Sequence, residues 1–188
     1  MAAAARLVNG RRLELTTGDI TVQQVDAVAN AANAALRGGG GVDGAIHRAA
    51  GPELLEELQR RYPGGTPTGT AVATQAYRLP ARWVLHAVGP VWRGGSHGEP
   101  ELLARAYRTC LALCDELGAR SVAFPAISMG IYGYPPQEGA EVAVQTVASH
   151  LDRDTSLELA RFVLFSSETH RVFAEALAKL ENPGSPSG

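Results

Sequence analysis

The sequence predicts an α/β protein folded as a three-layer α/β/α sandwich. Short apolar runs alternate with segments of helical periodicity along nearly the whole chain. The length of 188 residues fits one domain that can bury a core of its own. Apolar residues make up 45% and charged residues 19% of the chain, which is ordinary for a globular protein.

Six strands are expected. Residues 12–16 alternate polar and apolar side chains, which is typical of a half-buried strand. Residues 26–30 and 121–126 are expected to form buried strands. The remaining strands are expected over 69–76, 83–88 and 162–165.

Five helices are expected to alternate with these strands. The first covers about 44–50, and the second begins with Pro52 in its first turn and ends near Tyr62. Apolar residues recur at helical spacing over 102–117, and Gly118 follows as a C-cap. The last two helices are expected over 136–151 and 169–180.

The charge and the chain ends limit function and location. A net charge of −2 and a pI of about 6.2 argue against a nucleic-acid-binding protein, because that class carries basic surfaces. No apolar run approaches the length of a membrane span and the start lacks the apolar region of a signal peptide, so we expect a cytoplasmic protein. We expect an N-terminal extension over 1–10, one domain over 11–181 and a flexible tail over 182–188.

The two cysteines, Cys110 and Cys114, lie four residues apart on an expected helix. This spacing points both thiols to one face, and a disulfide within one helix suits the geometry of the bond poorly. Both are therefore predicted to be small core residues in a reducing compartment.

A run of four glycines, 38–41, lies between an expected strand and an expected helix. Glycine loses the most chain entropy on folding, so such a run indicates that the backbone approaches something closely. The N–H groups at the start of the helix would form an anion site. A flexible linker is the alternative, which we disfavour because small apolar residues and a helix follow at once.

Two other loops are less distinctive when each is taken alone. Gly18 permits an unusual turn after the first strand, and the carboxylate of Asp19 either caps a helix or accepts a ligand's N–H. Residues 124–135 leave a strand and turn through Gly130 and Gly133. This second segment is either a plain tight loop or a second wall of exposed amides around a phosphate.

Taken together, these segments resemble the signature loops of macro domains. The resemblance is carried by Thr17-Gly-Asp-Ile-Thr21, Asn30-Ala-Ala-Asn33, Gly38-Gly-Gly-Gly-Val-Asp-Gly-Ala-Ile-His47 and Gly130-Ile-Tyr-Gly133. The glycine run that ends in Val42-Asp43-Gly44 resembles the MacroD-type hydrolase branch, and residues 85–90 and 121–126 fit it too. The match extends from about Leu13 to Leu180 and implies a macro domain over 11–181 with a mixed central sheet.

The resemblance implies a site for ADP-ribose. Asp19 would accept a hydrogen bond from the adenine amino group, with the Ile20 amide nearby and the Phe165 ring as an apolar platform. Ser166-Ser167 departs from the acidic pair often seen after this position, and packing in the core is the alternative for Phe165. Two backbone walls would enclose the diphosphate, formed by Gly39, Gly40, Gly41 and Val42 and by Ser128, Met129, Gly130, Ile131, Tyr132 and Gly133.

The same resemblance implies the catalytic residues. Asn33 would hydrogen-bond the distal ribose, which Tyr132 would cover, while Asn30 would brace the loop from within. Asp43 would orient a water, with help from the bound diphosphate. His47, four residues later, either shapes the site or packs beneath it, and His86 is expected to be a core histidine.

Two ester hydrolyses are implied: removal of mono-ADP-ribose from acidic side chains and deacetylation of O-acetyl-ADP-ribose. The expected partners are ADP-ribose, its esters and ADP-ribosylated proteins, with no membrane, and with nucleic acid only as an ADP-ribosylated substrate. No cofactor and no metal are expected, because no His/Cys set with zinc spacing is present. The glutamate pair expected in poly-ADP-ribose glycohydrolases is also missing after the glycine run.

Three alternatives stay open. A non-catalytic module that only binds ADP-ribose is the strongest, although Asn33, Asp43 and the full glycine run favour an enzyme. A dinucleotide-binding oxidoreductase would use Gly39-x-Gly41-x-x-Gly44, but the acidic residue expected about 20 residues later is missing. A serine hydrolase would use Ser128, but glycines and prolines stand where a helix should follow.

Overall fold

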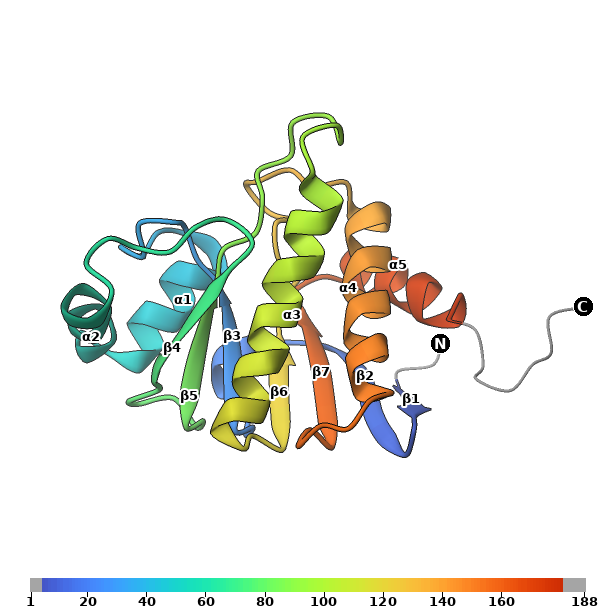
Figure 1. Ribbon diagram of the computed structural model, residues 1–188, viewed down its shortest axis with the longest axis horizontal. Coiled ribbons are helices and arrows are strands. Elements are labelled where there is room, and N and C mark those ends of the chain that lie inside the picture. The colour runs from blue at the N-terminus through green and yellow to red at the C-terminus, as the bar shows by residue number, and fades with distance from the viewer. Residues whose placement is uncertain (1–4, 181–188) are drawn as a thin grey trace, which may run out of the picture.

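A seven-stranded mixed sheet forms the middle layer of the structure, a computed structural model that describes residues 5–180 (Figure 1). The five inner strands are parallel, and the first and last strands of the order pair antiparallel with their neighbours. The order across the sheet is β1 (Ala5–Val8), β2 (Arg11–Thr17), β7 (Leu159–Leu164), β6 (Ser121–Phe124), β3 (Ala27–Ala31), β5 (Trp83–Ala87) and β4 (Ala71–Gln75).

Helices cover both faces of this sheet. On one face lie α3 (Glu99–Leu117), α4 (Pro136–Leu151) and α5 (Ser167–Ala178), packed side by side (Figure 1). On the other face, α1 (Gly41–Ala50) and α2 (Glu53–Arg61) cover β3, β5 and β4, and the short 3₁₀ helix η1 (Ile20–Val22) contacts α1. The predicted three-layer sandwich with a mixed sheet is therefore confirmed.

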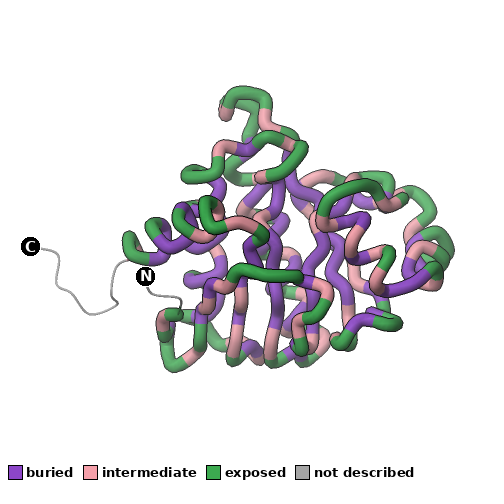
Figure 2. The backbone as a smooth tube through the Cα atoms, turned by 180° about the vertical axis from the view of Figure 1, so that it is seen from behind, coloured by how far each residue is buried: buried purple, intermediate pink, exposed green. Residues whose placement is uncertain are grey.

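Alternate strand residues belong to two different cores. The strands of the middle layer are largely buried (Figure 2). In β3, Ala27 and Ala29 pack under α3 and α4, whereas Val28 packs under α1. Side chains alternate along a strand, and Asn30 lies two residues after Val28, so Asn30 also faces α1. The same alternation turns His86 of β5 toward α1.

Most expected elements are present, with shifted ends. Helix α4 has the expected bounds, and Gly118 caps α3 in a left-handed conformation with a φ of 71°. Helix α1 begins at Gly41 and not at 44, because glycines conceal a helix start that has no side-chain cap. The sequence missed η1 and also β1, which lies within the stretch 1–10 expected to precede the domain. The domain limits at 11 and 181 stay predictions, and the tail at 182–188 lies outside the described residues.

Both cysteines are free and buried, as predicted. Burial raises the pKa of the Cys110 thiol to about 12, so it stays protonated and unreactive. Among residues 5–180, no helix combines the length and the apolar character that crossing a bilayer requires.

The outer edge of β4 is covered by side chains of α2. The buried carboxylate of Glu57 accepts hydrogen bonds from the Gln75 backbone N–H and from the Tyr77 hydroxyl, at 3.1 and 2.8 Å. Arg61, which pairs with Glu57 at 2.6 Å, donates to the carbonyl of Ala73, as does the hydroxyl of Tyr62. The Ala73 carbonyl and the Gln75 N–H at this edge are therefore hydrogen-bonded within the chain.

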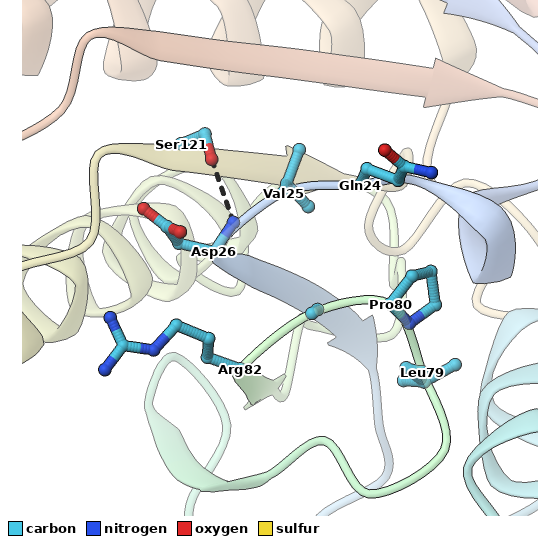
Figure 3. Close-up of a pocket in the computed structure, with 8 residues that line it drawn as sticks. Gln24, Val25, Asp26, Leu79, Pro80, Arg82 and Ser121 are labelled. Atoms are coloured by element: carbon cyan, nitrogen blue, oxygen red, sulfur yellow. Dashed lines mark hydrogen bonds between the residues drawn. The ribbon is translucent and has the colours of Figure 1, made fainter.

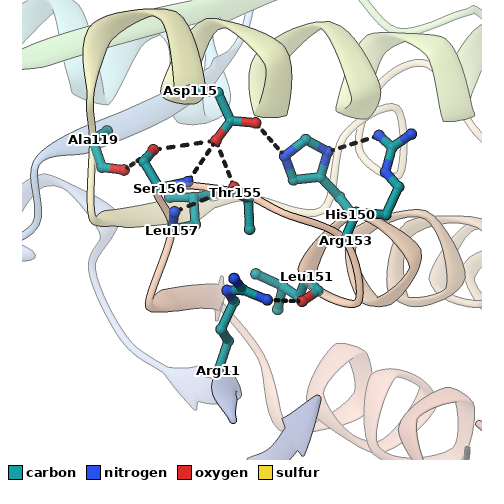
Figure 4. Close-up of polar contacts among 9 residues, drawn as sticks. All are labelled: Arg11, Asp115, Ala119, His150, Leu151, Arg153, Thr155, Ser156 and Leu157. Atoms are coloured by element: carbon teal, nitrogen blue, oxygen red, sulfur yellow. Dashed lines mark hydrogen bonds and ion pairs between the residues drawn. The ribbon is translucent and has the colours of Figure 1, made fainter. Parts of the chain in front are cut away.

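Asp115, near the end of α3, joins three segments at the amino edge of the sheet (Figure 4). Its Oδ1 accepts hydrogen bonds from the Thr155 hydroxyl and the Ser156 N–H, and its Oδ2 lies 2.9 Å from Nε2 of His150. Burial raises the pKa of Asp115. The hydrogen bonds from these donors, that of Thr155 first, lower the pKa by more, so the net shift is downward. The carboxylate therefore ties α3 and α4 to the turn before β7.

We expect Asp115→Ala to lower the free energy of unfolding by about 2 kcal/mol at neutral pH, because hydrogen bonds to a charged group are lost. The folded-state pKa of Asp115 lies below the ordinary value, so this stabilisation is present above the unfolded pKa and disappears as the pH falls through the folded pKa. Denaturant unfolding of both proteins at about pH 7 and about pH 3 measures the difference. Asp154→Ala, at an exposed position nearby, is the control. A difference of equal size at both pH values would contradict this account.

Candidate functional site

The residues predicted for the site follow the carboxyl ends of four parallel strands, which all lie at one edge of the sheet. Asp19 and Ile20 follow β2, Phe165 follows β7, residues 128–133 follow β6, and residues 33–43 follow β3. The strand order β2, β7, β6, β3 fixes the order of these loops along the edge. Three strand spacings, roughly 14 Å, separate the first loop from the last.

At the β2 end, Asp19 and Phe165 come from neighbouring strands. The Gly18 N–H donates to the Leu164 carbonyl at 2.9 Å, which brings the two loops together. The Phe165 ring is 80% exposed, whereas Ile20 is buried in the core under α1. Asp19 caps η1, because its Oδ1 accepts from the hydroxyl and the N–H of Thr21, and these bonds lower its pKa. Oδ2 is the Asp19 oxygen that this cap does not use.

The glycine run folds over the first turn of α1. A Cβ atom on Gly44 would lie 2.5 Å from the carbonyl oxygen of Gly39, so only glycine fits there. A Cβ atom on Gly39 would lie 3.4 Å from Oδ2 of Asp43, whereas those on Gly40 and Gly41 would meet open space. The backbone at 39–41 therefore lies open beside the start of a helix, where N–H groups favour an anion. Val42, in the same turn, packs partly against the core under α1.

Asn33 and Asn30 make different contacts in this loop. Asn33 braces the loop, because its Nδ2 donates to the Gly38 carbonyl at 2.9 Å and its Oδ1 accepts from the Arg37 N–H at 3.4 Å. Asn30, expected to brace the loop, is fully buried and donates from Nδ2 to Oδ1 of Asp43 at 2.8 Å. The difference arises because Asn30 is still within β3, on the face that α1 covers.

Asp43 and His47 form a polar pair one turn apart on α1. Asp43 is buried, and its Oδ1 lies 3.3 Å from Nε2 of His47 in addition to its bond from Asn30. The ring of His47 is mostly buried and packs beside Gly38. With Oδ1 held by these neighbours, Oδ2 is the oxygen that faces the glycine run.

The loop after β6 is held from beneath. The Tyr107 hydroxyl of α3 donates to the Pro125 carbonyl and accepts from the Ile127 N–H, at 3.2 and 3.0 Å. Ser128 has a φ of 67°, and its buried Oγ has no hydrogen-bond partner among the described residues. A Cβ atom on Gly89 would overlap that oxygen, so the loop after β5 packs against it.

The tip of this loop is exposed. Gly133 donates to the Gly130 carbonyl to close a turn that leaves Ile131 94% exposed and Tyr132 half-buried. Met129 differs, because its side chain packs toward Gly139 of α4 and the core. Position 129 can therefore offer only its backbone to a ligand at the carboxyl edge of the sheet.

The loop after β5 also contributes to this edge, although no motif in the sequence indicated it. The Trp92 N–H donates to the Tyr132 carbonyl at 2.8 Å, and the Trp92 ring contacts that of Tyr134. Glu99 accepts from the N–H groups of Arg93, Gly95 and His97. Although burial raises the pKa of Glu99, these N–H groups lower it to about 2. Short of a motif, the signal in the sequence is a glutamate in the first turn after a glycine-rich loop.

An open pocket at the opposite, amino edge of the sheet carries none of the predicted residues (Figure 3). Its polar groups support the fold: Ser121 Oγ accepts from the Asp26 N–H at 2.8 Å, and Asp26 Oδ2 accepts from the Arg120 N–H at 2.7 Å. The predicted residues therefore gather at the carboxyl edge alone.

Comparison with known proteins gives relatives for nearly the whole chain. The model of the macro domain family matches residues 29–143. The chain is 55% identical over 170 residues to an O-acetyl-ADP-ribose deacetylase of Salmonella gallinarum, and this match covers 89% of this chain and 95% of that protein. It is 48% identical over 172 residues to a macro domain-containing protein of Caldanaerobacter subterraneus, covering 90% of this chain and 98% of the relative.

Solved structures agree with this assignment. A macrodomain of Oceanobacillus iheyensis with ADP superposes with a TM-score of 0.88 at 41% identity, covering 93% of this chain and 94% of the other. A Trypanosoma brucei macrodomain in complex with ADP-ribose superposes with a TM-score of 0.81 at 39% identity, covering 88% and 68%. Sequence, loops and fold agree, and the chain belongs to the macro domain family.

Proposed function

We propose that this protein binds ADP-ribose along the carboxyl edge of its sheet and hydrolyses esters at the distal ribose. The proposal is carried by Asp43, a buried carboxylate with Oδ1 held by Asn30 and Oδ2 turned toward the glycine run. Relatives named O-acetyl-ADP-ribose deacetylase at 52–55% identity support the reaction, and neighbours solved with ADP or ADP-ribose support the ligand.

The loop order suits an extended nucleotide. Adenine would lie at the β2 and β7 end, with its amino group donating to Oδ2 of Asp19 and its ring on the exposed face of Phe165. The diphosphate would lie between residues 39–42 and 128–133, near the start of α1, where backbone N–H groups and the helix dipole favour negative charge. The distal ribose would then lie beside Asn33 and under Tyr132.

In the proposed reaction, Asp43 Oδ2 accepts a hydrogen bond from a water and orients it, with the substrate diphosphate close by. For O-acetyl-ADP-ribose, the water oxygen attacks the acetyl carbonyl carbon, the ester C–O bond breaks and the ribose oxygen takes a proton. The products are acetate and ADP-ribose. We extend the proposal to mono-ADP-ribosylated acidic side chains, where hydrolysis of the ester frees the carboxyl group and ADP-ribose. We also propose a cytoplasmic location, because two free buried cysteines suit a reducing compartment.

The function is tested with two substrates. We expect purified protein to release acetate from O-acetyl-ADP-ribose and ADP-ribose from a glutamate-ADP-ribosylated protein, both followed by mass spectrometry. Saturable binding of ADP-ribose without release from either substrate, even at high enzyme concentration, would identify a binding module. Absence of binding in calorimetry would refute both functions.

Asp43→Ala is expected to lower kcat about a hundredfold or more, because the oriented water loses its acceptor. The Kd for ADP-ribose should change little, since the carboxylate contacts the water and not the nucleotide. Steady-state kinetics and calorimetry measure the two effects separately. Asp154→Ala, an exposed aspartate near the amino edge, is the matched control. A parallel loss of turnover and affinity would mean that Asp43 mainly shapes the pocket.

Asp19→Asn tests the adenine contact while keeping the cap on η1. The asparagine Oδ1 can still accept from Thr21, but Nδ2 replaces the oxygen that would face the adenine amino group. We expect the Kd for ADP-ribose to rise about tenfold, the cost of losing a charged hydrogen bond. Preference over the inosine analogue, which lacks the amino group, should disappear. Unchanged affinity and preference in calorimetry would remove Asp19 from the site.

A further inference from the structure

Asn30 and His86 lie behind Asp43 as two fully buried polar side chains. They are register neighbours on β3 and β5, on the face that α1 covers. A buried amide or imidazole costs free energy unless it is hydrogen-bonded, so the partners of these groups define what they do.

The partners form one continuous chain of hydrogen bonds. Nδ2 of Asn30 lies 2.8 Å from Oδ1 of Asp43 and 3.2 Å from Nδ1 of His86. On the other side of the ring, Nε2 of His86 lies 3.0 Å from Oγ1 of Thr74. The Thr74 hydroxyl lies 3.0 Å from the Gln75 carbonyl oxygen, which can only accept.

These contacts fix the direction of every bond in the chain. Because the Thr74 hydroxyl donates its hydrogen to the carbonyl, its oxygen accepts from Nε2–H of His86. Nδ1 of His86 is then unprotonated and accepts one N–H of Asn30, whose second N–H goes to Asp43. Turning the amide over would put Oδ1 of Asn30 against both the Asp43 carboxylate and the lone pair of Nδ1. A neutral imidazole thus holds the amide in one orientation.

The charges around His86 agree with a neutral ring. Burial lowers the pKa of His86 to about 3, and the neighbouring His47 lowers it too, while Asp43 and Glu57 act in the opposite direction. The rings of His47 and His86 are 6.3 Å apart. The imidazole therefore stays an acceptor at Nδ1 over the whole neutral range.

We propose that His86 is a positioning residue, which acts through Asn30 to hold Oδ1 of Asp43 and so leaves Oδ2 as the oxygen that orients the water. The water depends on the proposed function, whereas the hydrogen-bond directions depend on the fold alone. The role of His86 is distinct from that of His47, which contacts Asp43 directly from the same helix.

The first test reads the tautomer without any substrate. In wild-type protein labelled with ¹⁵N at histidine, two-bond ¹H–¹⁵N spectra should show His86 protonated at Nε2 alone from about pH 8 to about pH 5. The Asn30 side-chain amide signal should shift in Asp43→Ala. A proton on Nδ1 of His86 would overturn the proposal. This test is independent of turnover, so a wild type that hydrolyses no ester would refute the proposed function without changing its result.

The second test separates positioning from folding. His86→Leu removes the acceptor at Nδ1 and should lower kcat for O-acetyl-ADP-ribose about tenfold, with the Kd for ADP-ribose nearly unchanged. His86→Asn, whose Oδ1 can accept from Asn30, should recover part of kcat. His150→Leu is the matched control, because it removes another buried histidine at the far edge and should lower stability without lowering kcat of the folded protein.

Two kinetic outcomes would overturn the proposal: an unchanged kcat in His86→Leu, or an equal loss of kcat and affinity that His86→Asn does not recover. If His86→Leu does not fold, Thr74→Val decides. It removes the oxygen that accepts from Nε2–H, and we expect a mixture of tautomers with a reduced kcat. A mixture of tautomers with full kcat in Thr74→Val would also overturn the proposal.

Discussion

The hydrogen bond from Asn30 to Asp43 joins the central sheet to the first turn of α1. It joins the buried amide of Asn30 in β3 to a carboxylate that is also buried, so neither group can be left unpaired without a cost in free energy. The glycine run lies between the two residues in the sequence, and its Gly39 lies against Oδ2 of Asp43. Strand, loop and helix thus share one polar contact, and the orientation of the proposed catalytic carboxylate depends on it.

Most of the other groups that would face a ligand at this edge belong to the backbone. Lys179 is the only lysine of the chain, and it lies at the end of α5 and pairs with Glu141 of α4. Glycines allow close approach at two points of this edge: Gly44 admits the carbonyl of Gly39, and Gly89 admits the hydroxyl of Ser128. Buried side chains support the exposed turns from beneath, Tyr107 under the loop after β6 and Glu99 under the loop after β5. A diphosphate held in this way would meet preorganised N–H groups with little side-chain entropy to lose.

The sequence was informative where local patterns decide the structure. Periodicity gave α4 its bounds, Gly118 ended α3 as expected, and the loop motifs indicated the family. The start of α1 was misplaced because glycine has low helix propensity, and β1 was missed because four residues carry too little pattern. The role of Asn30 depends on the strand face it occupies, and that of Trp92 on its contact with the loop after β6. Such pairings are properties of the assembled sheet, which no local pattern records.

The covering of β4 by α2 also limits how this molecule can meet others. A sheet edge with free N–H and C=O groups is a template on which a foreign strand can pair. Here Arg61 and Tyr62 already donate to the Ala73 carbonyl, and Glu57 accepts from the Gln75 N–H. A partner that recognises its target by strand addition would have to break an ion pair and displace a helix to dock at this edge. The same feature protects the β4 edge of the sheet from edge-to-edge aggregation.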